Sequence, residues 1–101
     1  VLLVNNGSYG TIRMHQEREY PAHVSGSGLS NPDFCALARA YGYAAERITH
    51  TAEFEPALQR ALAAPGGSLI EALLDVDVIT TRGTLAAIRQ NAQNSQRGTT
   101  M

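Results

Sequence analysis

The sequence predicts an α/β fold with three layers, a parallel sheet with flanking helices. Three segments of strand length, two of them largely apolar (1–4 and 68–76) and a shorter one at 43–48, alternate with segments of helical character. This order favours parallel strands with right-handed crossovers and ligands at the carboxyl ends of the strands. The third run lacks polar alternation, which is typical of a strand covered on both faces.

The first strand, 1–4, leads through a turn into a helix expected over 11–19. Tyr20-Pro21 should end this helix, because the residue before a proline avoids the α conformation. The segment 24–30 is rich in Gly and Ser and is expected to be a flexible connection.

A second helix is expected to begin near Asn31, with Asn31 as the N-cap and Pro32 at the first helical position. Gly42 supplies its C-terminal stop. Apolar residues recur at i, i+3, i+4 and i+7 and predict one buried face. These residues are Phe34, Leu37, Ala38 and Tyr41.

The strand at 43–48 should be followed by a helix that Thr51 caps and that residues 64–67 end. Glu53 and Glu55 are placed in its first turn, where the helix dipole favours acidic side chains. Pro56 fits only if this helix starts late.

Glu71 interrupts the apolar run at 68–76, where a charge is costly unless it is paired. We therefore expect a hydrogen-bonded structural residue there. A last short helix is expected over 80–89, with Leu85 and Ile88 turned inward. Residues 90–101 are polar and are expected to form a flexible tail.

Composition indicates one compact globular unit: 101 residues, 44% hydrophobic, 17% charged, with a net charge of −1. The absence of lysine and of a basic stripe disfavours nucleic-acid binding, and no apolar run approaches the ~20 residues that span a bilayer. A cytoplasmic location is the default expectation. Cys35, the single cysteine, has no nearby histidine to activate it and is interpreted as a packing residue.

The turn that follows the first strand carries the chemistry, in the sequence Asn5-Asn6-Gly7-Ser8-Tyr9-Gly10. Glycines let the main chain approach a phosphate, and the N–H groups at the start of the next helix favour an anion. Asparagine oxygens suit a hard divalent cation. The pattern indicates a site for a metal-bound diphosphate.

The stretch from Asn5 to Arg13 resembles the second half of the thiamine-diphosphate signature, which opens with Gly-Asp-Gly and closes on Asn-Asn. The continuation through Pro21 is similar to acetolactate-synthase-like and benzoylformate-decarboxylase-like enzymes. The segment from Asn31 to Gly42 fits the same domain. The resemblance makes residues 1–89 the C-terminal portion of a thiamine-diphosphate-binding domain, with 90–101 as the tail.

The resemblance implies thiamine diphosphate and Mg²⁺ as cofactors. Asn6 would give the metal a side-chain oxygen, and Ser8 a backbone carbonyl. Tyr9 and Gly10 would line the diphosphate through their N–H groups, with Gly7 in the same cofactor-binding turn. The alternative for Asn6 is an ordinary turn asparagine that satisfies local backbone. Asn5 is expected to tie the strand end to a neighbouring segment.

Ile12 and His15 lie three apart on one helical face, and the resemblance places that helix beside the substrate pocket. His15 is a weak candidate for proton relay, against the alternative of a surface or packing histidine. Arg13 and Arg18 could bind a carboxylate, although solvated charges are the commoner outcome. The glutamate that activates the cofactor is expected in another domain.

No Gly-Asp-Gly occurs, and the chain starts inside a core strand, so we expect a fragment that is inactive in isolation. The parent enzyme, a lyase or transferase, would decarboxylate or carboligate 2-oxo acids. Expected partners are that substrate, the remaining domains and further copies in a dimer or tetramer. The alternative is a non-catalytic fragment or homologue that acts in assembly. A nucleotide-binding domain is disfavoured, because the long glycine motifs are missing.

Overall fold

A computed structural model describes residues 1–80 and 82–99 of the chain. The chain divides into two compact units, and not into the single unit that composition indicated. Unit 1 contains Val1–Asn5 and Ser30–Leu74, and unit 2 contains Asn6–Leu29 and the described residues from Asp75 onward.

Unit 1 is built on a parallel sheet of three strands in the order β1-β3-β2. The strands are β1 (Leu2–Asn5), β2 (Ala44–Ile48) and β3 (Ser68–Leu73). The central strand, β3, places Glu71 opposite Leu3 of β1 and Arg47 of β2. The predicted parallel sheet is confirmed.

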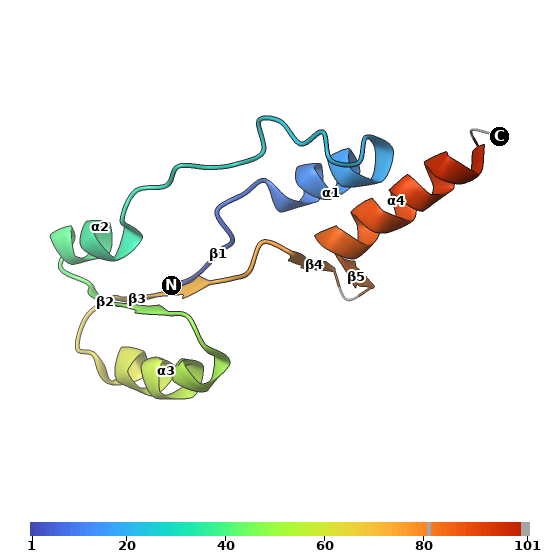
Figure 1. Ribbon diagram of the computed structural model, residues 1–101. Coiled ribbons are helices and arrows are strands. Elements are labelled where there is room, and N and C mark those ends of the chain that lie inside the picture. The colour runs from blue at the N-terminus through green and yellow to red at the C-terminus, as the bar shows by residue number, and fades with distance from the viewer. Residues whose placement is uncertain (81, 100–101) are drawn as a thin grey trace. The chain divides into compact units, whose positions relative to one another are not determined.

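Helices cover both faces of this sheet (Figure 1). The helix α3 (Phe54–Ala63) packs where Ile48, Ala57 and Ile70 form a buried cluster. The helix α2 (Phe34–Ala40) packs against the other face, toward the side chains of Leu3 and Leu69. Since successive side chains of a strand point to opposite faces, Leu69 faces α2 and Ile70 faces α3. The three-layer α/β prediction is confirmed.

The start of α2 differs from the expectation. Asp33, and not Asn31, is the N-cap, because its carboxylate accepts the N–H of Ala36 at 3.1 Å. Asn31 is occupied elsewhere and donates its side-chain amide to Asn5. Gly42 ends the helix as expected, with a φ of +82°.

A 3-10 turn (Thr51–Glu53) precedes α3, so Thr51 is not the cap that was expected. The Glu53 carboxylate accepts the N–H groups of Thr49 and His50, at 3.2 and 2.9 Å, and so orders the entry to α3. Pro56 then falls in the first turn of α3, where no backbone N–H is needed.

The third strand ends at Leu73, earlier than the expected residue 76. Asp75 accepts the N–H of Asp77 at 2.9 Å, which forms a local turn in place of extended backbone. A small antiparallel pair that the sequence pattern did not predict follows, β4 (Val78–Thr80) with β5 (Gly83–Thr84).

Unit 2 pairs α1 (Gly10–Glu19) with α4 (Leu85–Thr99), which contact each other. The Glu17 side chain is buried between them: one oxygen accepts the N–H of Ala22, and the other lies 3.4 Å from Nε of Arg89.

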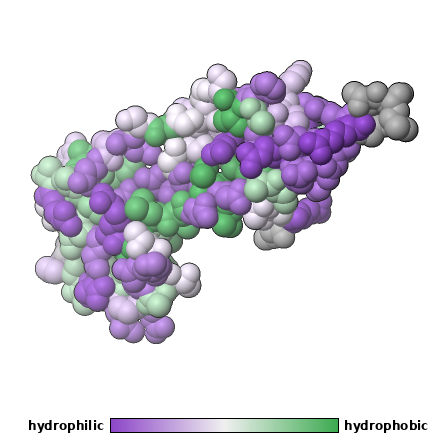
Figure 2. All heavy atoms as spheres, in the orientation of Figure 1, coloured by the Kyte–Doolittle hydropathy of each residue, from purple (hydrophilic) through white to green (hydrophobic). Residues whose placement is uncertain are grey.

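The expected end of the last helix at Arg89 is wrong, because α4 continues through Thr99. Leu85 is buried and Ile88 half-buried, as expected. Beyond Arg89 the sequence is rich in Gln and Asn, and the visible face of α4 is largely hydrophilic in Figure 2. Residues 100 and 101 of the expected tail lie outside the described residues.

No helix within 1–80 or 82–99 has the length and apolar character needed to cross a membrane.

Candidate functional site

The 6–10 turn, residues 6 to 10, follows the carboxyl end of β1 directly. Asn6 Oδ1 accepts the N–H of Ser8 at 3.1 Å, and Gly7 between them has a φ of +66°. This is the local turn that the alternative for Asn6 described. It does not exclude a metal, because an amide oxygen has a second lone pair.

The 25–29 segment, residues 25 to 29, is bonded to this turn. Tyr9 N–H donates to the Ser27 carbonyl at 2.8 Å, and Leu29 N–H donates to the Gly7 carbonyl at 2.9 Å. Ser8 and Gly28 thereby form an isolated antiparallel bridge. The Tyr9 N–H, which was expected to face a diphosphate, is occupied by Ser27.

This bridge fixes where the two expected metal ligands point. The peptide between Ser8 and Tyr9 is planar and trans, so the Ser8 carbonyl points opposite to the Tyr9 N–H and away from Ser27. By the same argument, the Ser8 N–H points away from Leu29 and toward Asn6 Oδ1. The Asn6 amide oxygen and the Ser8 carbonyl oxygen therefore lie on the same side of the chain.

The helix α1 begins directly after these residues. Its first hydrogen bond runs from the N–H of Arg13 to the carbonyl of Tyr9, so the N–H groups of Gly10, Thr11 and Ile12 precede the helical ladder. No acidic residue occupies the first turn. This end of α1 is electrostatically suited to an anion.

Gly10 is required by space. A Cβ there would lie 2.6 Å from Ile79 Cδ1 and 2.9 Å from Asn6 Nδ2. The missing side chain thus lets the Asn6 amide pack against the start of α1.

The donor set fits half of a magnesium site. Asn6 and Ser8 offer two oxygen donors of the hard, neutral kind that Mg²⁺ accepts. Among the described residues, no group of three His, Cys, Asp or Glu side chains is placed to hold a metal. The negative charge that balances the ion would have to come from a diphosphate and from a carboxylate outside these residues.

Ile12 and His15, expected beside a substrate pocket, are both exposed on α1, and Ile12 is 54% exposed. Arg13 is half-buried with its Nε unpaired, while Arg18 is exposed in the last turn. The described part of the chain therefore does not enclose Ile12 and His15 in a pocket.

A buried carboxylate, Glu71, holds the end of β1. Its two oxygens accept from Asn5 Nδ2 at 2.9 Å and from Arg47 Nε at 2.7 Å. Arg47 also pairs with Asp33 at 3.0 Å. The hydrogen bond from Arg47 and the one from Asn5 hold the pKa of Glu71 below its usual value despite burial. The predictions of a hydrogen-bonded Glu71 and of a tying role for Asn5 are confirmed.

Cys35 is buried on the same face of the sheet, with its Sγ 3.9 Å from Glu71 Oε1. Burial, and secondarily the negative charge of Glu71, raise the pKa of this thiol. A thiol that resists ionisation is a poor nucleophile, in agreement with a packing role.

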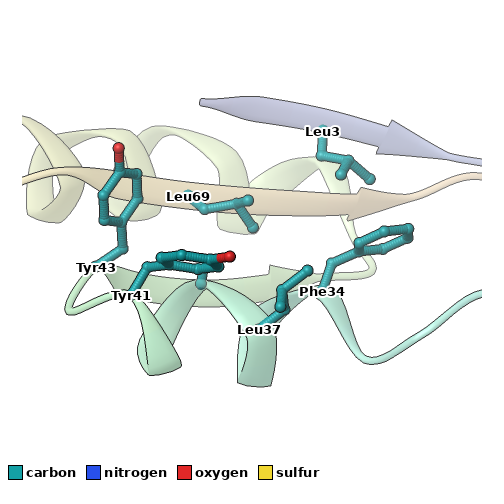
Figure 3. Close-up of a pocket in the computed structure, with 7 residues that line it drawn as sticks. Leu3, Phe34, Leu37, Tyr41, Tyr43 and Leu69 are labelled. Atoms are coloured by element: carbon teal, nitrogen blue, oxygen red, sulfur yellow. The ribbon is translucent and has the colours of Figure 1, made fainter.

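Unit 1 also has an apolar groove of about 450 Å³ beside α2 (Figure 3). The side chains that line it include no carboxylate or imidazole, and their polar groups are the hydroxyls of Tyr41 and Tyr43. The lining residues are Leu3, Phe34, Leu37, Ala38, Tyr41, Tyr43 and Leu69.

Comparison with known proteins gives the family. Residues 1–72 match the family described as thiamine pyrophosphate enzyme, C-terminal TPP binding domain. The match covers more than half of the 101 residues. The chain belongs to this family.

Curated relatives of this thiamine pyrophosphate enzyme domain include two acetolactate synthase large subunits. The one from Cyanidium caldarium is 28% identical over 95% of the chain, and the one from Parasynechococcus marenigrum is 37% identical over 70%. A benzoylformate decarboxylase from Pseudomonas aeruginosa is 37% identical over 69% of the chain. The chain spans 16%, 12% and 13% of the length of these three relatives, respectively.

The matched range includes both the 6–10 turn and Glu71 of this thiamine pyrophosphate enzyme domain. Sequence reasoning found the turn from its asparagines and glycines. It missed the 25–29 segment and the pairing of Arg47 with Glu71. The pairing of Arg47 with Glu71 could have been predicted from the sequence, since the two residues carry opposite charges in two of the expected strands.

Proposed function

We propose that the chain is part of a thiamine-diphosphate- and Mg²⁺-dependent enzyme that acts on 2-oxo acids, by decarboxylation, carboligation or both. The observation that carries the proposal is the 6–10 turn, which presents the Asn6 and Ser8 oxygens on one side at the start of a helix. Membership of the thiamine pyrophosphate enzyme family supports it.

In this proposal Asn6 Oδ1 and the Ser8 carbonyl hold the metal. The N–H groups at the start of α1, beginning with Gly10, hold the diphosphate, and Gly7 provides the positive φ that the turn needs. Tyr9 contributes by position, since its N–H is used by Ser27. When bound, thiamine diphosphate supplies the electron sink for loss of CO₂ from a 2-oxo acid.

Ile12 and His15 are proposed to border the substrate. His15 follows Ile12 by three residues, so their side chains share one face of α1. An exposed imidazole at that place could transfer a proton to or from a group of the substrate. A glutamate of another domain would activate the cofactor.

The rest of the enzyme is proposed to supply an aspartate from a Gly-Asp-Gly segment, the missing domains and further copies of the chain in a dimer or tetramer. The low share of the relatives' length that the chain covers supports these further domains. We also propose a cytoplasmic location and a lyase or transferase activity, with the isolated 101 residues inactive.

The test is calorimetric titration of thiamine diphosphate into the native protein, with and without Mg²⁺, beside determination of the intact mass and of the sequence around these residues. We expect Mg²⁺-dependent binding that Asn6→Ala weakens at least tenfold, because a metal ligand is lost. Asn31→Ala, which removes an amide from the other unit, is the control. A native protein that binds neither ligand would favour the assembly role.

A further inference from the structure

The 25–29 segment is fixed more firmly than a Gly- and Ser-rich sequence suggests. Besides the two bonds of the bridge, the Ser27 carbonyl accepts Ser8 Oγ at 2.9 Å, and the Ser25 carbonyl accepts Gln16 Nε2 at 2.7 Å. Ser27 is only 1% exposed. The segment is therefore seated on the 6–10 turn and on α1, and it is not the flexible connection that was expected.

The bonds around Ser8 act on the peptide planes that carry the proposed metal ligands. Leu29 N–H donates to the Gly7 carbonyl and so fixes the peptide plane between Gly7 and Ser8. The N–H of that plane, which belongs to Ser8, donates to Asn6 Oδ1. The Ser27 carbonyl holds the plane between Ser8 and Tyr9, whose other polar group is the Ser8 carbonyl. Without these bonds the Gly7–Ser8 plane would keep its contact with Asn6 Oδ1, and both planes would lose the constraint that residues 25 to 29 place on them.

We propose that the 25–29 segment is a positioning element of the metal–diphosphate site and orients Asn6 Oδ1 and the Ser8 carbonyl toward the ion. This inference rests on the proposed function. Its residues touch neither metal nor cofactor; they act through Gly7, Ser8 and Tyr9. Preorganised ligands bind a metal more tightly, because no conformational freedom is lost when the ion arrives.

Gly26 offers a clean way to disturb the segment. Its φ is +71°, a conformation that alanine adopts only with strain, and a Cβ there would meet nothing within 4 Å. Gly28, two residues on, has equally open space and no positive φ. Gly26→Ala and Gly28→Ala are therefore a matched pair that differ in backbone strain.

The experiment measures the apparent Mg²⁺ affinity of the native protein at fixed thiamine diphosphate. We expect Gly26→Ala to weaken it roughly five- to tenfold. Gly28→Ala should stay within twofold of the wild type. Gly26→Asn should recover most of the loss, because asparagine tolerates this region of φ. Affinity for thiamine diphosphate at saturating Mg²⁺ should change less than the apparent Mg²⁺ affinity, a split that general loss of fold would not give.

Hydrogen exchange provides a second readout that needs no ligand. The amides of Tyr9 and Leu29 should be protected in the wild type and should exchange faster in Gly26→Ala, with those of β3 unchanged. Wild-type affinity in Gly26→Ala, or equal losses in Gly26→Ala and Gly28→Ala, would overturn the inference. Absence of any binding by the wild type would instead overturn the proposed function.

Discussion

Glu71 is a buried carboxylate that two neighbouring strands hold in its charged form. It is 2% exposed and bonded to Arg47 of β2 and Asn5 of β1. Burial alone would favour the neutral acid, but the hydrogen bonds from Arg47 and Asn5 outweigh it and lower the pKa. The charge thus contributes to the fold only while both partners stay in place.

The substitution Glu71→Gln should destabilise unit 1 by about 1–3 kcal/mol, because Arg47 and Asn5 lose a charged acceptor. The folded-state pKa of Glu71 lies below its unfolded value of about 4.3, so its contribution is present above that pH and is lost as pH falls through the folded pKa. When thermal unfolding of the native protein is measured between about pH 7 and 3, the difference in unfolding temperature between wild type and variant should be smaller at the acid end.

The matched control is Glu46→Gln. Glu46 pairs with Arg60 at 2.7 Å on the surface, where the side chains are 35% and 60% exposed. Hydrogen bonding from Arg60 also lowers the pKa of Glu46, but solvent screens the pair, so the loss at neutral pH should be small. Equal destabilisation by both substitutions would contradict the importance of burial at Glu71.

The start of α4 is set by side chains that cap it. Thr84 Oγ1 accepts the N–H of Ala87 at 3.1 Å, and Asp77 Oδ1 accepts that of Ala86 at 2.8 Å. Thr84→Ala should cost about 1 kcal/mol of local stability. Hydrogen exchange in the first turn of α4 should then be roughly fivefold faster. Thr84→Ser keeps the acceptor and should leave exchange unchanged; faster exchange there would argue against the cap.

The sequence predicted those elements that are determined by residues close together in the chain, and missed those determined by distant contacts. Periodicity and glycines predicted the sheet, α1, α3 and the stop at Gly42, since these follow from neighbouring residues. The prediction that Asn31 is the N-cap of α2 was wrong, because the Asn31 side-chain amide donates a hydrogen bond to Asn5, which is distant in sequence. The β4–β5 pair and the attachment of the 25–29 segment to the 6–10 turn depend on specific hydrogen bonds, which amino-acid composition does not predict.

The candidate site follows the same rule. The turn that holds Asn6 and Ser8 was predictable, because strand, turn and helix start are adjacent along the chain. The use of the Tyr9 N–H by Ser27 was not, because the two residues are 18 positions apart.

At the scale of the whole molecule, the proposed function predicts that ligand binding stabilises the fold. Thiamine diphosphate and Mg²⁺ bound only to the folded native protein should stabilise it by about 2.7 kcal/mol at a free concentration of 100 times Kd. The unfolding temperature should therefore rise with both ligands together and fall back when a chelator removes Mg²⁺. Asn6→Ala should lose most of this rise, and without ligand it should unfold slightly earlier than the wild type, because the Ser8 N–H loses its acceptor at a cost of about 1 kcal/mol. Glu71→Gln should unfold earlier yet keep the rise, because Glu71 is not proposed to touch either ligand. A rise that survives both the chelator and Asn6→Ala would show that the 6–10 turn does not hold the metal.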